Sequence, residues 1–166
     1  MTHADVSAET GLLLGYLNGQ RKHVLGILDG LPEDDLRRPV LPSGWTSLGM
    51  VRHLALDVER FWFRAVVAGE QVDLPSGDEG WQVGPDEPAA AVFAQYREEA
   101  ALADAIISGR TLDSRAAWWP SEIFPNMPEQ QLRQTILHVI AETATHAGHL
   151  DAVRELIDGR TWLVLT

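Results

Sequence analysis

The stretch HVIAETATHAGH, residues 138–149, contains three of the six histidines of the chain and one glutamate. His138, Glu142 and His146 follow one another at intervals of four residues, and His149 comes three residues later. Residues four apart on an α-helix share a face, so Glu142 and His146 could hold one metal ion between them. The alternative is a histidine-rich polar face in which a histidine hydrogen-bonds to the glutamate and no metal is present.

The apolar residues of this segment repeat at the four-and-three spacing of a bundle helix. This spacing predicts a buried seam of Leu132, Ile136, Val139, Thr143, His146, Leu150, Val153 and Ile157. Glu142 and His149 flank the seam, and His138 lies about 80° from His146 at roughly 100° per residue. A buried imidazole beside a half-buried carboxylate is costly unless both are paired or bind a cation. This one helix is therefore compatible with a metal pair and with a hydrogen-bonded pair.

A metal site usually needs a third protein ligand from another element. The remaining histidines are His3 near the terminus, His23 near the end of the first expected helix, and His53 in the first turns of the second. His23 could simply interact with the helix dipole. The helix around His53 is apolar nearly all round, so periodicity does not orient this side chain. Asp57, one turn later, could be its hydrogen-bond partner, a solvent-facing ion-pair residue or an alternative ligand.

Four helical segments are expected to position these residues. Their approximate bounds are 7–29, 46–68, 89–109 and 129–158, with Thr46 and Ser47 as N-caps and Gly69 and Gly159 as stops. The only apolar, β-prone run is TWLVLT at the C-terminus. Long helices without alternating strands predict an all-α fold, a four-helix bundle with long connections. The length of 166 residues suits one domain over residues 1–166.

The composition narrows the classes of partner. The net charge of −11 argues against nucleic acid, because a phosphate-binding surface needs clustered lysine and arginine. The absence of cysteine excludes disulfides, zinc fingers and a cysteine nucleophile. No apolar run approaches the roughly 18 residues that would span a membrane, and the start does not resemble a signal peptide. We therefore expect a cytoplasmic protein whose partner is a small molecule.

Two segments together carry a resemblance. GWTSLGMVRHLALDVERFW and LRQTILHVIAETATHAGHLDAVRELIDG resemble helices of the DinB-like superfamily of four-helix-bundle metalloproteins. The likeness is greatest to its actinobacterial branch, which includes the mycothiol-dependent maleylpyruvate isomerase type. In that family a divalent metal is held by a histidine of the second helix and an HxxxH or ExxxH pair of the last long helix. The resemblance thus implies His53, Glu142 and His146 as metal ligands.

The implied ligand set leaves a coordination position open. Two neutral histidines and one carboxylate suit Zn²⁺, the metal we expect, and also Fe²⁺, Ni²⁺ or Co²⁺. The resemblance further implies a low-molecular-weight thiol such as mycothiol as the cofactor at this position. Three functions follow: a thiol-dependent transferase or isomerase, a metal-dependent hydrolase, and a non-catalytic, stress-related metal- or ligand-binding bundle. A homodimer is compatible with each of them.

Several other side chains have alternative roles. His149 is the candidate catalytic acid or base, although it could also support a ligand or merely flank the seam, and His138 is expected to be structural. The segment RAAWWPSEIF, residues 115–124, could form an aromatic wall or lid over a pocket. Alternatively, its Trp118 and Trp119 could close the hydrophobic core at one end. Arg52 and Arg60 could bind an anionic substrate, or they could form surface ion pairs.

Overall fold

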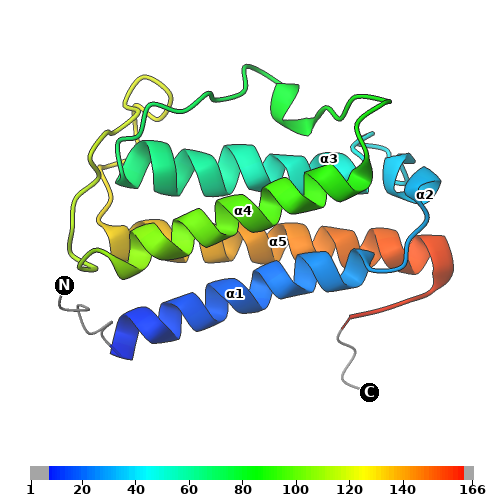
Figure 1. Ribbon diagram of the computed structural model, residues 1–166, viewed down its shortest axis with the longest axis horizontal. Helices are drawn as coiled ribbons and strands as arrows, with labels where there is room; N and C mark the ends of the chain where they lie inside the picture. Colours follow the sequence, from blue (N-terminus) through cyan, green and yellow to red (C-terminus); the bar gives the residue numbers. More distant parts are fainter. Residues whose placement is uncertain (1–7, 163–166) are drawn as a thin grey trace.

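The structure, a computed structural model, describes residues 8–162 and is built from helices and long connections (Figure 1). In chain order the elements are α1 (Ala8–Leu28), α2 (Glu33–Arg37), α3 (Ser47–His53), the π-helix η1 (Leu54–Val67), the 3₁₀ turn η2 (Glu79–Trp81), α4 (Ala89–Ser108) and α5 (Leu132–Asp158). Residues 8–162 contain no strand, only one isolated bridge between Arg115 and Gln131. The expected all-α bundle is confirmed. His3 and residues 163–166 of the TWLVLT run lie outside the described residues.

The directions of the long helices determine where the connection between η1 and α4 runs. In Figure 1, α1 and α5 run in one direction, whereas α3, η1 and α4 run in the other. The connection between η1 and α4 therefore runs back along the outside of the bundle, and it carries η2 past α3. α1 packs along α5, and α4 packs along η1. Among the described residues, no helix is long and apolar enough to cross a membrane.

The residues that α5 contributes to the hydrophobic core are mostly those of the predicted seam. Its buried members are Leu132, Ile136, Val139, Thr143, Leu150 and Val153. His146 and Ile157 are half-buried, and Ala147 is buried next to His146. His146 therefore reaches toward the core while part of its ring stays accessible.

The second long helix differs from the regular α-helix expected over residues 46–68. It is α-helical from Ser47, where Thr46 caps the Gly49 amide at 3.0 Å, and it becomes a π-helix after His53. At its end the Ala68 amide still donates to the carbonyl of Phe63, five residues earlier, at 3.0 Å. π-Helices are rare and occur frequently at functional sites. Here the π-helix begins at Leu54, directly after the candidate metal ligand His53.

A buried ion pair ties the π-helix to its neighbours. Arg21 of α1 donates from Nε and Nη2 to the two carboxylate oxygens of Glu59 in η1, at 2.7 and 2.6 Å. Its third nitrogen donates to Asp104 of α4 at 2.6 Å. Glu59 is fully buried, and a buried charge without its partner is strongly destabilising. The pair therefore fixes η1 against α1 and α4.

Candidate metal centre

Three side chains from two elements converge in the bundle. His53 comes from the last turn of α3, and Glu142 and His146 come from the middle of α5. One potential ligand atom from each of them lies within 4.8 Å of the other two. His53 Nε2 is 3.8 Å from Glu142 Oε1, and the His53 and His146 rings meet edge to face at 5.1 Å between centroids. The residues that the resemblance singled out are thus brought together.

The imidazole of His53 is held on both of its sides. Its Nδ1–H donates to Asp57 Oδ2 at 2.8 Å, because a carboxylate can only accept, and this leaves Nε2 facing Glu142. The indole of Trp81 in η2 stacks on the imidazole, with ring centroids 4.0 Å apart and planes 14° from parallel. Asp57 was considered as a hydrogen-bond partner of His53, a solvent-facing ion-pair residue or an alternative ligand, and the structure shows it as the hydrogen-bond partner. Such partners fix the tautomer and orientation of a histidine ligand.

Two glycines allow η2 to lie this close to α3. A Cβ atom on Gly80 would be 2.0 Å from Asp57 Oδ2, and one on Gly49 would be 2.4 Å from the carbonyl oxygen of Trp81. Neither contact could be tolerated without movement. Sequence reasoning missed Trp81 and Gly80, because an isolated turn in a Gly/Pro-rich connection carries no helical or strand pattern. It also missed the role of Gly49, which lies within α3 and contacts a turn far away in the chain.

Glu142 has a partner on its own helix. Nε2 of His138 lies 3.2 Å from Glu142 Oε2, and the His138 ring also meets Trp62 at 4.7 Å between centroids. Burial by itself raises the pKa of Glu142, but the hydrogen bond from His138 and the nearby charges of His138, His53 and His146 lower it, and the net pKa is below the usual value. Glu142 is therefore a carboxylate at neutral pH. The four-residue spacing between His138 and Glu142 was the signal for this contact.

His146 is in the state that a metal ligand needs. Burial, and next the charge of His53, lower its pKa to about 4 although Glu142 acts in the opposite direction. The imidazole is therefore neutral at pH 7, and metal binding requires the neutral form. Nδ1 of His146 is buried, and no residue in the described part of the chain hydrogen-bonds to it. A neutral imidazole beside a second imidazole and a carboxylate fits a divalent cation.

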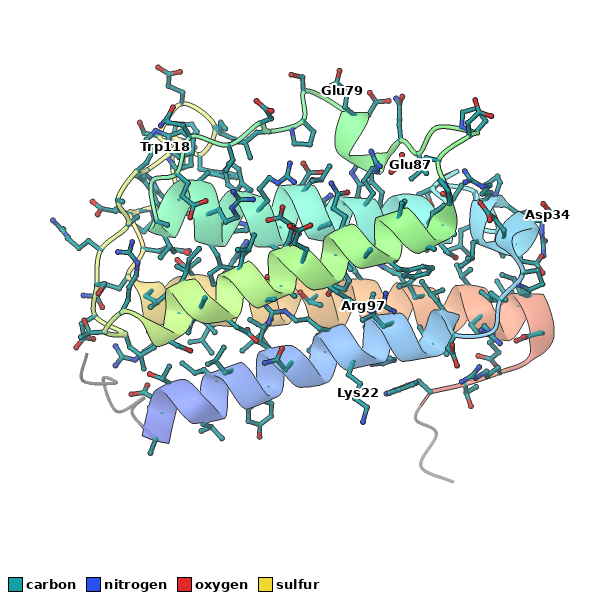
Figure 2. The ribbon with its side chains drawn as sticks, viewed as in Figure 1. Lys22, Asp34, Glu79, Glu87, Arg97 and Trp118 are labelled. Carbon is teal, nitrogen blue, oxygen red and sulfur yellow. The ribbon has the colours of Figure 1, made fainter. Side chains whose placement is uncertain are left out.

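A cavity of about 590 Å³ opens beside His53 and Glu142. Its lining residues are His53, Asp57, Phe61, Trp62, Leu74, Pro75, Ile123, Phe124, Met127, His138, Ala141, Glu142 and Thr145. The connection between α4 and α5 supplies Ile123, Phe124 and Met127, and the first two belong to the segment 115–124 considered as a wall or lid. Trp118 and Trp119 do not line it. Figure 2 shows Trp118 in the same connection, and its side chain is 43% exposed.

The other candidate residues have different surroundings. His149 is exposed, with its ring 5.8 Å from His146 and 6.2 Å from Trp45, and it does not line the cavity. Nε2 of His23 lies 2.8 Å from Asp151, away from the metal-ligand cluster.

The two arginines considered as substrate ligands both form ion pairs. Arg52 pairs with Glu87, which Figure 2 labels at the start of α4, and Arg60 pairs with Glu99 at 2.7 Å. Of the two roles considered for Arg52 and Arg60, the structure therefore shows the ion pairs.

Comparison with known protein families gives a match over residues 12–159, to the mycothiol-S-transferase family. This chain belongs to that family. The match spans the long helices and all three members of the cluster, and it agrees with the resemblance to a mycothiol-related DinB-like branch. No curated protein matched the chain. In this member of the mycothiol-S-transferase family, the cluster and the cavity therefore lie within the part of the chain that defines the family.

Proposed function

We propose that this protein is a metal-dependent mycothiol S-transferase, which joins the sulfur of mycothiol to a small electrophile. The observation that carries the proposal is the convergence of His53, Glu142 and His146 within 4.8 Å, beside a cavity that His53 and Glu142 line, in a chain of the mycothiol-S-transferase family. The chain contains no cysteine, so the sulfur that reacts must belong to a small molecule.

Two neutral imidazoles and one carboxylate are the proposed ligands of a divalent ion, with Zn²⁺ as the expected metal and Ni²⁺, Fe²⁺ or Co²⁺ as alternatives. When bound, such an ion supplies Lewis acidity that lowers the pKa of a thiol. Asp57 keeps Nε2 of His53 turned toward Glu142, and His138 keeps Glu142 ionised. These contacts prepare the ligand set before any ion arrives.

In the proposed reaction a bond forms between the thiol sulfur and a carbon of the electrophile. The bond from that carbon to its leaving group breaks, and the leaving group departs with the electron pair. The thiol proton must reach solvent. His149 is the proposed carrier, because it is exposed while its ring lies 5.8 Å from that of His146. We expect His149→Gln to lower the thiol-dependent rate and leave the metal content unchanged.

Thiol binding can be tested directly with the Co²⁺-substituted protein. Addition of mycothiol should produce a sulfur-to-metal charge-transfer band in the near ultraviolet. Ligation releases a proton, so the apparent affinity for the thiol should increase with pH until the pH reaches the pKa of the free thiol, about 8.5. His53→Ala, in which the cluster is broken, is the control that should show no band.

Two other functions predict different results. A metal-dependent hydrolase predicts turnover that needs metal but no thiol, and no band. A non-catalytic bundle with a closed metal site predicts neither the band nor turnover, because no coordination position is open. Absence of the band with several thiols, in protein shown to contain its metal, contradicts the transferase proposal.

A further inference from the structure

We propose that the cavity beside the cluster binds the electrophile and selects a flat, uncharged, apolar molecule over an anionic one. The inference rests on the proposed S-transferase function and adds the class of the second substrate. It is drawn from three properties of the cavity: its aromatic walls, the charges around it and its shortage of free hydrogen-bond donors.

The walls offer flat apolar surfaces. Trp62 and Phe124 stack with ring centroids 5.6 Å apart and planes 16° from parallel, and Phe61 meets Trp62 edge-on at 5.1 Å. Ile123, with 58% of its surface exposed, and Met127 continue this surface from the connection before α5. A volume of about 590 Å³ is in the range of small-molecule sites, and aromatic walls favour ligands that are themselves flat.

The charges around the cavity disfavour an anion. Among the described residues no arginine or lysine lines it, and the two carboxylates that do are Asp57 and Glu142. Arg60 lies on η1, the helix that also carries Asp57, but its guanidinium donates hydrogen bonds to Glu99 and to the carbonyl of Asp73. The two carboxylates offset the charge of one divalent ion, so no excess of positive charge remains in the metal-bound state. An entering carboxylate would lose its water without gaining an arginine or lysine partner, and the open coordination position of the ion is the proposed place of the thiol.

Among the described residues that line the cavity, only the side chains of His53, Trp62, His138 and Thr145 can donate a hydrogen bond, and three of these four are engaged. The hydroxyl of Thr145 donates to the Ala141 carbonyl at 2.9 Å, and Nδ1–H of His53 is used by Asp57. His138 faces Glu142 at 3.2 Å. A carboxylate, which needs several donors when it is buried, would find few here. The lining therefore favours a neutral aromatic electrophile over a carboxylate or dicarboxylate.

The test compares two ligands of nearly the same shape that carry no leaving group. Nitrobenzene and para-nitrobenzoate both quench tryptophan fluorescence, and Trp62 lies in the cavity wall. With the metal-free protein at neutral pH, in which no coordination position can take the carboxylate, nitrobenzene should bind at least about tenfold more tightly, a difference of about 1.4 kcal/mol. Equal or tighter binding of para-nitrobenzoate overturns the proposal, and so does quenching by neither ligand.

A substitution at the cavity wall localises the effect. Thr145 is exposed on α5 and lines the cavity, and arginine is a good helix former, so Thr145→Arg should fold. The new cation should strengthen the binding of para-nitrobenzoate by about tenfold or more. Thr145→Gln, which extends the side chain without a charge, should not. Unchanged affinities in Thr145→Arg would show that the ligands bind elsewhere, which also overturns the proposal.

Turnover is measured separately, with mycothiol and para-nitrobenzyl chloride. Here the carbon–sulfur bond forms, the carbon–chlorine bond breaks, chloride leaves with the electron pair and the thiol proton goes to solvent. Preferential binding of nitrobenzene without turnover of this or other electrophiles contradicts the transferase function and leaves the selectivity of the cavity standing. Turnover accompanied by a preference for para-nitrobenzoate contradicts the selectivity alone.

Discussion

His53, Glu142 and His146 each owe the chemical state that a metal ligand requires to a different cause. Asp57 accepts a hydrogen bond from Nδ1–H of His53, His138 contributes to the lowered pKa of Glu142, and burial keeps His146 neutral. The two hydrogen-bond partners lie four residues from the ligand that they support, on the same helical segment. His53 and Glu142 are thus each oriented by a residue of their own helical segment. The three ligands come together because α3 packs against α5.

We expect replacement of His53, Glu142 or His146 by alanine to reduce the metal content of the purified protein sharply. His23→Ala is the matched control, because His23 pairs with Asp151 outside the cluster. His138→Ala should keep the metal at a stoichiometric concentration, with an affinity lower by roughly tenfold because Glu142 loses its partner. Elemental analysis and chelator competition measure both quantities. Full metal content in His53→Ala would instead indicate Asp57 or His149 as the third ligand.

The stability of the metal-free protein should depend on the protonation of His146. Its pKa is 6.5 in the unfolded reference state and about 4 in the folded protein. Between these values the unfolded chain binds the proton and the folded one does not, so the free energy of unfolding should fall as the pH falls from about 6.5 to about 4.

Urea unfolding at several pH values measures this effect. In His146→Leu the decrease should be smaller, because leucine fits the seam position and does not titrate. An equally steep decrease in His146→Leu would show that other groups cause it.

At the level of the elements, the site depends on the long connection that returns along the bundle. This connection brings η2 beside α3 (Figure 1). There Trp81 stacks on His53, and Gly80 faces Asp57 of η1. Figure 2 shows Glu79 of the same turn on the outer side of the bundle. The turn is held by contacts rather than by periodic structure. Small changes in its side chains should therefore alter the metal site.

Gly80→Ala tests this contact. The added Cβ would lie 2.0 Å from Asp57 Oδ2, so either Asp57 must release His53 or η2 must move away. We expect the metal affinity to fall by roughly tenfold or more, as for other losses of a ligand's supporting group. Gly84→Ala in the same connection is the control, because its Cβ would meet nothing within 4 Å. Similar metal affinities for the two variants, measured by chelator titration, would contradict the assigned role of η2.

In the whole molecule, the cluster links two pairs of helices. α5 packs mainly along α1, and η1, which continues α3, packs mainly along α4. A metal held by His53, Glu142 and His146 would therefore join one pair to the other. An ion that binds the folded chain and not the unfolded one stabilises the fold by mass action.

Zn²⁺ at 100 times its dissociation constant should raise the free energy of unfolding by about 2.7 kcal/mol. For a chain of this size that corresponds to an increase in Tm of about 5–10 °C. Circular dichroism melts with added Zn²⁺ and with excess chelator measure the difference. Glu142→Ala should show no such increase, and a full increase in that variant would place the metal elsewhere.

The sequence by itself predicted the helical bundle, the buried seam of α5 and the proximity of Glu142 to His146. These features depend on spacing within one helix, which local periodicity encodes. The choice of His53 came from the resemblance and not from periodicity, because its helix is apolar nearly all round. Its role as a metal ligand, like the roles of Glu142 and His146, stays a prediction.

Only the tertiary structure revealed the π-helix after His53, the stacking of Trp81 on its imidazole, and an aromatic cavity to which Phe124 contributes and Trp118 does not. The physical reason is the same in each case. These contacts join residues that are far apart in the chain, through connections without a repeating pattern, and their geometry is decided by how the helices pack. Among residues 8–162 no arginine or lysine lines the cavity, and this too is a property of several segments together and of none of them alone.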